Sequence, residues 1–165
     1  MQIRRLVEAD LDALWALRLR GLSEAPQAFG STHDEALRRG PESVRQRLVA
    51  GDDFCYRGAC VPDLVGMIAF ARETGAKERH KGSLISLYVL PEWRRQGVAR
   101  VLAEALIAEA GQLPGLEQLH LTVVTSGVAA ASLYRSLGFQ VYGTAPRSLK
   151  QDGRYWDEDL MLRYL

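Results

Sequence analysis

The chain has 165 residues, 47% of them hydrophobic and 25% charged, with a formal net charge of +1 at pH 7. A chain of this length and composition builds a globular core, which excludes disordered, collagenous and coiled-coil proteins, and the near-neutral charge argues against a nucleic-acid partner. No apolar run approaches the roughly 20 residues of a membrane span, and the N-terminus runs into an acidic segment instead of a signal-peptide core, so we expect a cytoplasmic protein without a membrane partner.

Cysteines, histidines and linkers also limit how the chain is organised. Two cysteines, Cys55 and Cys60, cannot form a disulfide framework for a fold of this size, and we expect both to be buried or half-buried strand thiols. The three histidines are widely spaced and predict no metal site. No repeat or low-complexity linker divides residues 1–165, which we expect to form one domain.

The first third of the chain predicts a strand followed by helices. Gln2–Val7 has the pattern of a strand, and Asp10 stands where a helix N-cap belongs. The buried face of the helix that follows is formed by Leu11, Leu14, Trp15 and Leu22. Ser23–Gly40 is expected to be a long, partly helical connecting segment, and segments of this kind often contribute to a functional site. A short helix is expected to start at Pro41.

The middle of the chain predicts three strands. Phe54–Val61 and Leu64–Glu73 are strand-like runs joined by the turn Pro62-Asp63, and we expect them to form an antiparallel hairpin. Ser83–Leu90 is almost wholly apolar, which is the pattern of a strand covered on both faces.

The last third predicts alternating helices and strands. An amphipathic helix begins at Val98, and the strand Leu119–Val124 follows it. Gly127–Leu137 is an alanine-rich helix, after which a strand starts at Phe139. A tight turn precedes the last strand, Tyr155–Tyr164, and indicates a terminal hairpin. Together the elements predict an α+β domain around a mixed sheet.

The stretch Leu87–Arg100 carries the most information about function. A buried strand ends, a loop with Arg94 and Arg95 follows, and a helix begins with small residues at Gly97 and Ala99. Backbone N–H groups at a helix start lack internal partners and carry partial positive charge, so this geometry binds phosphate. The alternative is an ordinary strand-to-helix turn with surface arginines, and the turn by itself leaves both open.

Two motifs, in order, resemble those of the GNAT superfamily of acetyl-CoA-dependent N-acetyltransferases. Arg94, Gly97 and Ala99 match its pyrophosphate-binding pattern, and Leu133–Phe139 matches its second signature, a Leu-Tyr helix that closes with Leu-Gly-Phe. The resemblance covers essentially the whole chain. It implies a GNAT-like α+β fold, with a mixed, mostly antiparallel central sheet of about seven strands flanked by helices.

The resemblance also implies roles for individual residues. The backbone of Leu87, Tyr88 and Val89 would bind the pantetheine arm and the thioester carbonyl of acetyl-CoA. Tyr134 would lie near the thioester sulfur and protonate the leaving thiolate, and packing of its ring on the sheet is the structural alternative. The pyrophosphate would be held at Arg94 and by the amides of Arg95, Gln96, Gly97, Val98, Ala99 and Arg100.

The sequence departs from the family pattern at two positions. Many members carry an asparagine where this chain has Gly127, so Ser126 or the backbone is expected to replace that contact with the cofactor. No carboxylate stands on the strand before the turn, and the commonly acidic position on the next strand is Thr122. His120 shares a strand face with Thr122 and could take the proton of the amine directly or through water, and a structural histidine is the alternative.

Two charged residues interrupt apolar faces. Glu158 breaks the apolar row of the last strand, where a carboxylate must pair, face solvent or line a cavity, and of these we expect an exposed strand end. Arg18 breaks the apolar face of the first helix, where we expect a salt bridge rather than ligand binding.

The motifs predict an enzyme that moves an acetyl group from acetyl-CoA to the primary amine of a small molecule, by direct attack in a ternary complex. Neither a metal nor a nucleic acid is expected, and the sequence leaves a homodimer open. The charges that could hold the acceptor are Asp34, Glu35, Asp157 and Glu158 for an ammonium group and Arg147 or Lys150 for a carboxylate. Two alternatives are a non-catalytic acyl-CoA-binding regulatory module and an acetyltransferase for protein N-termini or lysines.

Overall fold

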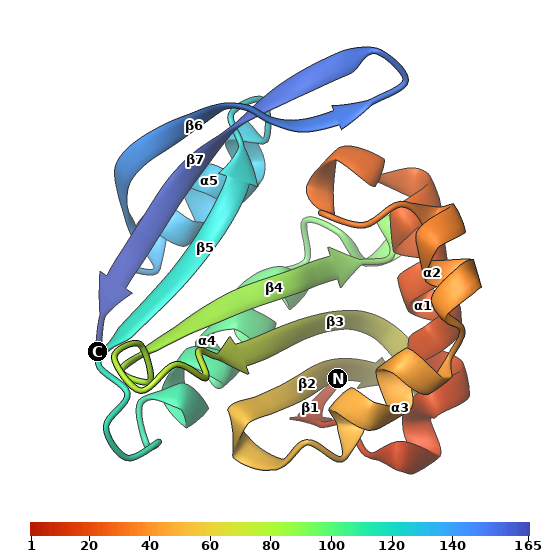
Figure 1. Cartoon of the computed structure of the whole chain (residues 1–165). Coiled ribbons are helices and arrows are strands. Elements are labelled where there is room, and N and C mark those ends of the chain that lie inside the picture. Colours follow the sequence, from red (N-terminus) through yellow and green to blue (C-terminus); the bar gives the residue numbers. More distant parts are fainter.

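A seven-stranded sheet organises the molecule, in the strand order β1-β2-β3-β4-β5-β7-β6 (Figure 1). The computed structural model describes all 165 residues. Neighbouring strands are antiparallel, except for β4 and β5, which are parallel. The strands are β1 (Gln2–Arg5), β2 (Phe54–Val61), β3 (Asp63–Arg72), β4 (Lys81–Val89), β5 (Gln118–Val124), β6 (Gln140–Gln151) and β7 (Arg154–Tyr164). This mixed, mostly antiparallel sheet confirms the predicted fold class.

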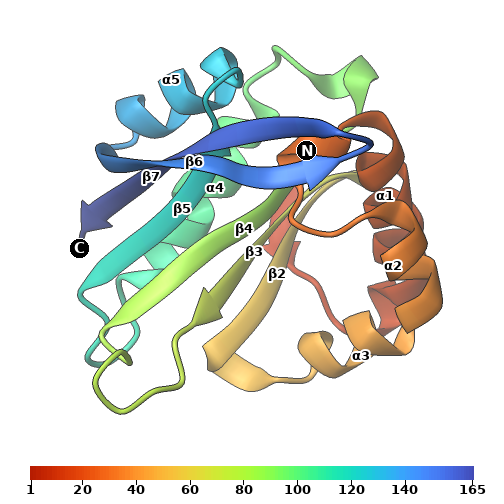
Figure 2. The ribbon, with the colours of Figure 1, turned by 45° about the horizontal axis from the view of Figure 1, so that its top comes forward.

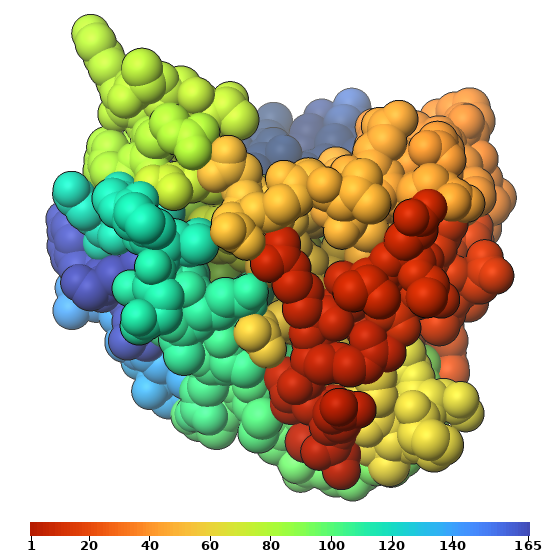
Figure 3. All heavy atoms as spheres, turned by 90° about the horizontal axis from the view of Figure 1, so that it is seen from below, coloured from red at the N-terminus to blue at the C-terminus, as the bar shows by residue number.

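Helices flank the sheet, with a separate group on each face. They are α1 (Leu11–Glu24), α2 (His33–Arg39), α3 (Glu42–Leu48), α4 (Val98–Ala110) and α5 (Val128–Ser136). Strand β3 turns alternate side chains to opposite faces. Ile68 and Phe70 therefore pack with α4 and α5, whereas Met67 and Ala69 pack with α1, α2 and α3. Seen from below, residues of β1 and α4 lie side by side (Figure 3).

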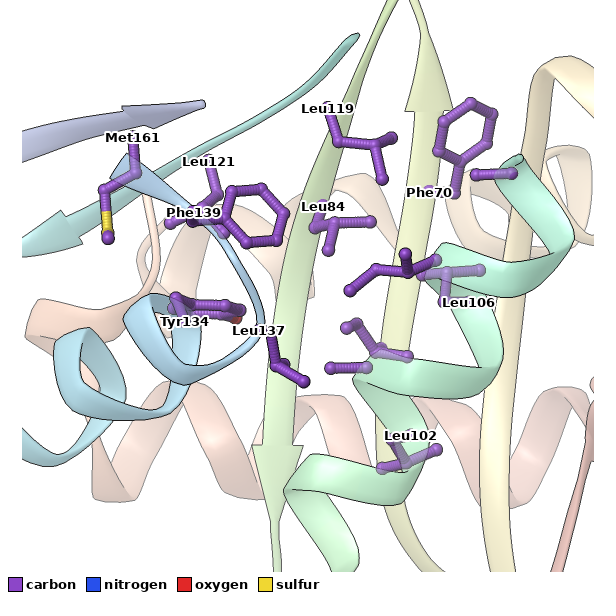
Figure 4. Close-up of a cluster of buried hydrophobic side chains, with 14 of the residues drawn as sticks. Phe70, Leu84, Leu102, Leu106, Leu119, Leu121, Tyr134, Leu137, Phe139 and Met161 are labelled. Atoms are coloured by element: carbon purple, nitrogen blue, oxygen red, sulfur yellow. The ribbon is translucent and has the colours of Figure 1, made fainter. Parts of the chain in front are cut away.

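The core on the α4 and α5 face fixes the position of α5 (Figure 4). Leu106 of α4 and Leu119 of β5 are fully buried, and Leu137 closes the end of α5. Tyr134 packs edge-on against Phe139, with 5.7 Å between the ring centroids. Burying each such side chain stabilises the fold by about 1.5–3 kcal/mol, so this contact set holds α5 and its tyrosine firmly against the sheet.

Most element boundaries follow the sequence pattern. The predicted hairpin of β2 and β3 is present, and the thiols of Cys55 and Cys60 on β2 are buried and free, as expected. Strand β4 begins at Lys81 rather than at Ser83, and β6 continues to Gln151. None of the helices is long and apolar enough to cross a membrane.

The predicted connecting segment before α3 contains α2, and a capping box fixes where α2 starts. The Thr32 hydroxyl accepts a hydrogen bond from the Glu35 amide at 3.1 Å, and the Glu35 carboxylate accepts one from the Thr32 amide at 2.9 Å. Such reciprocal bonds satisfy two amides of a helix start. The cap thereby anchors the end of the irregular segment 25–32, which reaches the cleft described below.

The two parts of the sheet are joined at only one end of β4 and β5. The three paired positions are Lys81 with Gln118, Gly82 with Leu119, and Ser83 with His120. Beyond them the strands diverge. Ser86 has a φ of 58°, and it lies where the pairing of β4 with β3 shifts register. A bulge of this kind bends a strand, and here the backbone of β4 beyond Ser83 has no strand partner on its β5 side.

Candidate active site

A cleft of about 490 Å³ opens where β4 and β5 diverge. Its walls come from α1, α3, β4, β5, α5, the segment before α2, and the β6–β7 hairpin. This hairpin extends toward α1 and α2 (Figure 2). The polar and small lining residues include Arg18, Arg47, Ser86, Thr122, Gly127, Tyr134 and Glu158. The volume lies within the range of about 300–1,000 Å³ that is typical of small-molecule sites.

Tyr134 lines this cleft from α5, although only 6% of its surface is exposed. Its hydroxyl makes no hydrogen bond to the protein, and its ring packs edge-on against Phe139 in the cluster that also contains Leu137 (Figure 4). Burial raises the pKa of the Tyr134 phenol above its ordinary value. The side chain therefore keeps its proton at neutral pH, and a protonated phenol at a cleft wall can donate to a leaving group.

The turn before α4 presents a row of free backbone amides. Gly97 is the N-cap of α4 with a φ of 81° and no capping side chain, and Arg95 also has a positive φ, 59°. The Val101 amide bonds the Gly97 carbonyl at 3.1 Å, so the amides of residues 98–100 have no partner within the helix. A Cβ at Gly97 would meet no atom within 4 Å. Open space beside free amides fits the pyrophosphate of acetyl-CoA.

Two of the three arginines near this turn have partners within the protein. Arg94 donates from Nε to the Val89 carbonyl at 2.9 Å, and Arg100 donates to the Ser136 hydroxyl at 2.7 Å. Arg95 is exposed and has no ion-pair partner. Arg94 therefore braces the end of β4, and Arg95 is the cation that is free to face a phosphate. Pyrophosphate contacts at these residues stay predictions.

The three predicted pantetheine contacts on β4 differ in their side chains. Leu87 lines the cleft, whereas Tyr88 and Val89 are buried. The Tyr88 hydroxyl donates a hydrogen bond to Glu24, and burial, together with this bond, raises the pKa of Tyr88 to about 12. The side chain of Tyr88 thus has a structural role, and the predicted contacts depend on the strand backbone.

His120 lies outside the residues that line the cleft. Its Nε2 is 3.0 Å from the Gln118 Oε1, and its ring meets Tyr142 edge-on with 5.9 Å between centroids. Burial lowers the pKa of His120, and the charge of Lys81 lowers it further, so the imidazole is neutral at pH 7. A role as the base stays a prediction, and a proton would have to reach His120 through water.

The position of the missing family asparagine is tightly packed. Gly127 lines the cleft, and a Cβ there would lie 3.0 Å from the Val124 carbonyl oxygen. Ser126 is exposed and does not line the cleft. A contact of Ser126 with the cofactor stays a prediction.

Glu158 and Arg18 differ from what the sequence predicted. Glu158 is half-buried and lines the cleft instead of ending an exposed strand, and it accepts hydrogen bonds from Thr122 at 3.0 Å and Ser148 at 2.5 Å. Arg18 forms no salt bridge and instead lines the same cleft, where it donates to the Ser86 hydroxyl at 3.2 Å. Strand and helix periodicity showed only that each charge interrupts an apolar face, and no local pattern indicates that the two converge.

The other charges predicted to hold the acceptor lie elsewhere. The residues outside the cleft are Asp34, Glu35, Asp157, Arg147 and Lys150. Glu35 caps α2, and Arg147 and Lys150 lie over the ring of Tyr155 at 4.9 and 5.0 Å. Of the predicted acceptor charges, only Glu158 lines the cleft.

Comparison with known proteins agrees with this geometry. The sequence profile of the acetyltransferase (GNAT) family matches residues 19–139. The chain belongs to this family. A crystal structure of a ribosomal-protein-alanine N-acetyltransferase from Brucella melitensis has a TM-score of 0.86 with this GNAT chain, at 27% identity and over 100% of both chains.

Two further relatives are informative. The L-amino acid N-acetyltransferase AaaT of Escherichia coli strain K12 is 26% identical to this GNAT chain over 106 residues, which are 64% of this chain and 65% of that protein. The structure of yncA from Salmonella typhimurium, a putative acetyltransferase with its cofactor acetyl-CoA, has a TM-score of 0.81 at 23% identity, covering 100% of this chain and 94% of that one. The chain spans between 30% and 65% of the length of three curated relatives that it matches.

The family that the profile describes is one of acetyltransferases, so membership confirms the class of enzyme that the motifs predicted. Acetyl-CoA is the cofactor named with the structure of yncA, in agreement with the predicted acetyl donor. No group of histidine, cysteine and carboxylate side chains is arranged to hold a metal ion.

Proposed function

We propose that this chain transfers the acetyl group of acetyl-CoA to the primary amine of a small molecule. The observation that carries the proposal is that two segments, one before α2 and one in the β6–β7 hairpin, form walls of the cleft. Residues 27–31 and Leu149 of the β6–β7 hairpin line the same cleft as the diverging strands. Walls on these sides leave room for a compact acceptor, whereas an extended polypeptide needs an open groove.

The chain's own groups suit a direct transfer. The amine nitrogen attacks the thioester carbonyl, and the unpaired backbone N–H groups of β4 beyond Ser83 stabilise the oxyanion. As the tetrahedral intermediate collapses, the C–S bond breaks, and the Tyr134 hydroxyl gives its proton to the thiolate. The proton that the amine loses goes to Glu158, because this carboxylate lines the cleft and His120 does not. Solvent returns a proton to Tyr134 after product leaves.

Direct attack of the amine on the thioester is also consistent with the burial and low reactivity of the two cysteine thiols. Cys55 and Cys60 are buried on β2 and do not line the cleft. Burial raises the pKa of the Cys55 thiol to about 11, so it carries almost no reactive thiolate at neutral pH. An acetyl-cysteine intermediate therefore has no support from either thiol.

The second candidate is acetylation of a protein N-terminus. It is supported by the ribosomal-protein-alanine N-acetyltransferase that superposes over the full chain, whereas AaaT, named for L-amino acids, supports the small-molecule acceptor. Both candidates share the acetyl donor and differ in the size of the acceptor.

Release of coenzyme A with three kinds of acceptor tests the proposal. The acceptors are free amines and amino acids, short peptides with free N-termini, and a folded protein. We expect saturable release with small acceptors. Release only with peptides or protein would contradict the proposal and favour the second candidate. Binding of acetyl-CoA without release for any acceptor would favour a regulatory module.

A further inference from the structure

Arg18 is the only charged residue in the buried set, with 8% of its surface exposed. It extends from α1 to the wall of the cleft. Its guanidinium makes one hydrogen bond, from Nη1 to the Ser86 hydroxyl at 3.2 Å, and no carboxylate pairs with it. Burying a cation without an anionic partner is costly, so a structural role alone does not account for this position.

The packing of α1 on β4 holds Arg18 at this depth. Gly21 follows Arg18 by one helical turn on the same face, and a Cβ there would lie 3.0 Å from the ring of Tyr88 and 3.1 Å from that of Phe29. A larger residue would push α1 away from the strand. The glycine therefore allows the close approach by which Arg18 reaches Ser86 at the bulge of β4.

No neighbouring group of the protein supplies a negative charge that compensates the charge of Arg18. Burial lowers the pKa of Arg18, and the like charges of Arg47 and Arg39 act in the same direction, against an opposite effect of Tyr56. The Tyr56 hydroxyl is itself buried without a hydrogen-bond partner. Arg47 also lines the cleft, and its guanidinium lies 5.2 Å from the ring centroid of Phe54 without an ion pair. Two arginines that line the cleft thus have no anionic side chain as a partner.

Two other partly buried arginines of this protein, Arg57 and Arg4, do have one, whereas Arg72 and Arg163 donate to backbone carbonyls. Arg57 Nε lies 2.5 Å from a Glu109 carboxylate oxygen, and Arg4 lies 2.6 Å from Asp10. Each of these four arginines has a carboxylate or a carbonyl acceptor, whereas Arg18 has neither and donates only to a hydroxyl. Because Arg18 lines a cleft and has no such acceptor, the geometry favours an anion that the ligand brings.

We propose that Arg18, assisted by Arg47, binds a carboxylate of the acceptor, so that the acceptor is a small molecule with both an amine and a carboxylate. The inference rests on the proposed function and narrows its acceptor. A guanidinium matches a carboxylate with two parallel hydrogen bonds. Glu158 lines the same cleft from β7 and suits the ammonium end of such a molecule. Opposite charges on the two sides of the cleft match a zwitterion.

A panel of L-amino acids and their amides tests the proposal, with coenzyme A release as the measurement. Each amide keeps the amine and the side chain and lacks the negative charge. We expect wild-type kcat/KM to be roughly tenfold or more higher for the acids, mainly through KM, and Arg18→Met to lose this preference. Arg20→Met is the matched control, because Arg20 lies on the same helix but is exposed and paired with Glu24.

A second measurement does not depend on turnover. The best amino acid of the panel is titrated calorimetrically into the enzyme with coenzyme A, and we expect Arg18→Met to weaken binding roughly tenfold or more. The melting temperature of Arg18→Met should equal or exceed that of the wild type, since the variant removes a buried unpaired charge. Ser86→Ala removes the hydrogen bond to Arg18 and keeps the charge, so it should retain the preference for acids.

The outcomes separate the two proposals. Equal wild-type activity on acids and amides overturns the carboxylate proposal and leaves the proposed function in place. A lower melting temperature of Arg18→Met with an unchanged preference for acids assigns Arg18 to structure and also overturns it. Turnover with peptides or proteins only overturns the proposed function itself, and the carboxylate proposal with it.

Discussion

Tyr134 and His120 lie on neighbouring elements, α5 and β5, and burial shifts the pKa of each toward its neutral form. The pKa of the phenol is raised, and the pKa of the imidazole is lowered. The neutral phenol is a proton donor, and the neutral imidazole has a free acceptor nitrogen. Only the phenol lines the cleft, so the two residues are expected to respond differently to substitution.

Tyr134→Phe keeps the ring and removes the proton. Turnover should fall by roughly ten- to a thousandfold, because the thiolate loses its acid, while the calorimetric affinity for acetyl-CoA changes little. Tyr164→Phe, at an exposed tyrosine of β7, serves as the control. Unchanged turnover under conditions in which chemistry limits the rate would assign Tyr134 to packing.

A comparison of two variants identifies the group that accepts the proton of the amine. Glu158→Gln should lower kcat by roughly ten- to a thousandfold, since the carboxylate of the cleft is lost, whereas His120→Gln should retain most of the wild-type rate. The measurement is kcat as a function of pH for both variants. The reverse result would support the base that the sequence predicted, His120, acting through water.

The lowered pKa of His120 has a consequence for stability. Below about pH 6.5 the histidine is protonated more readily in the unfolded chain than in the folded chain, because its pKa is lower in the folded state. The free energy of unfolding of the wild type therefore falls as the pH falls through this range. His120→Gln should show a smaller loss between pH 7.5 and pH 5.5 in urea unfolding. His33→Gln, on α2, controls for loss of an imidazole. An identical loss in the wild type and His120→Gln would contradict the assigned shift.

The turn before α4 combines a glycine in the left-handed region with free amides, and both features are local to a few residues. The positive φ of Gly97 orients the start of the helix, and no side chain fills the space in front of it. The first turn of α4 can therefore meet an anion directly.

Gly97→Glu should raise the dissociation constant for acetyl-CoA by roughly tenfold or more, because the carboxylate repels the phosphates and occupies their space. Gly97→Ala is the matched control: it shares the strain of a positive φ and lacks the charge and the bulk. Calorimetry measures the dissociation constant for acetyl-CoA of both variants. Equal affinities of the glutamate and alanine variants would show that the turn does not bind the pyrophosphate.

Three residue pairs at one end of β4 and β5 join the two parts of the sheet. The core of α4 and α5 spans both parts, but the strands themselves are separate along the cleft. A ligand bound between β4 and β5 would add contacts where the sheet has none.

Acetyl-CoA should therefore stabilise the protein as a whole. At a hundredfold excess over the dissociation constant the gain is about 2.7 kcal/mol, which corresponds to roughly 5–10 °C in melting temperature for a chain of this size. Hydrogen exchange should slow in β4 beyond Ser83 and in β5, and stay unchanged in β1. The Gly97→Glu variant at the same ligand concentration is the control. Protection confined to β1 and β2 would place the ligand elsewhere.

Features that consecutive residues form could be predicted from the amino-acid sequence. The turn at Gly97 and the Leu-Tyr helix of Tyr134 depend on local backbone geometry and on neighbours within one or two turns, so their pattern indicated the family and the acetyl donor. Strand and helix periodicity likewise predicted the α+β sheet, because side chains alternate at fixed intervals.

The charges that share the cleft could not be predicted in the same way, because they come from elements far apart in the chain. Arg18 and Ser86 are 68 positions apart, and Thr122 and Glu158 are 36 apart, so their contacts depend on how α1, the bulge of β4 and strand β7 pack together. Periodicity assigns a residue to a face, but it does not state what that face meets. For this reason Arg18 suggested a salt bridge and Glu158 an exposed strand end, until packing placed both charges on the walls of one cleft.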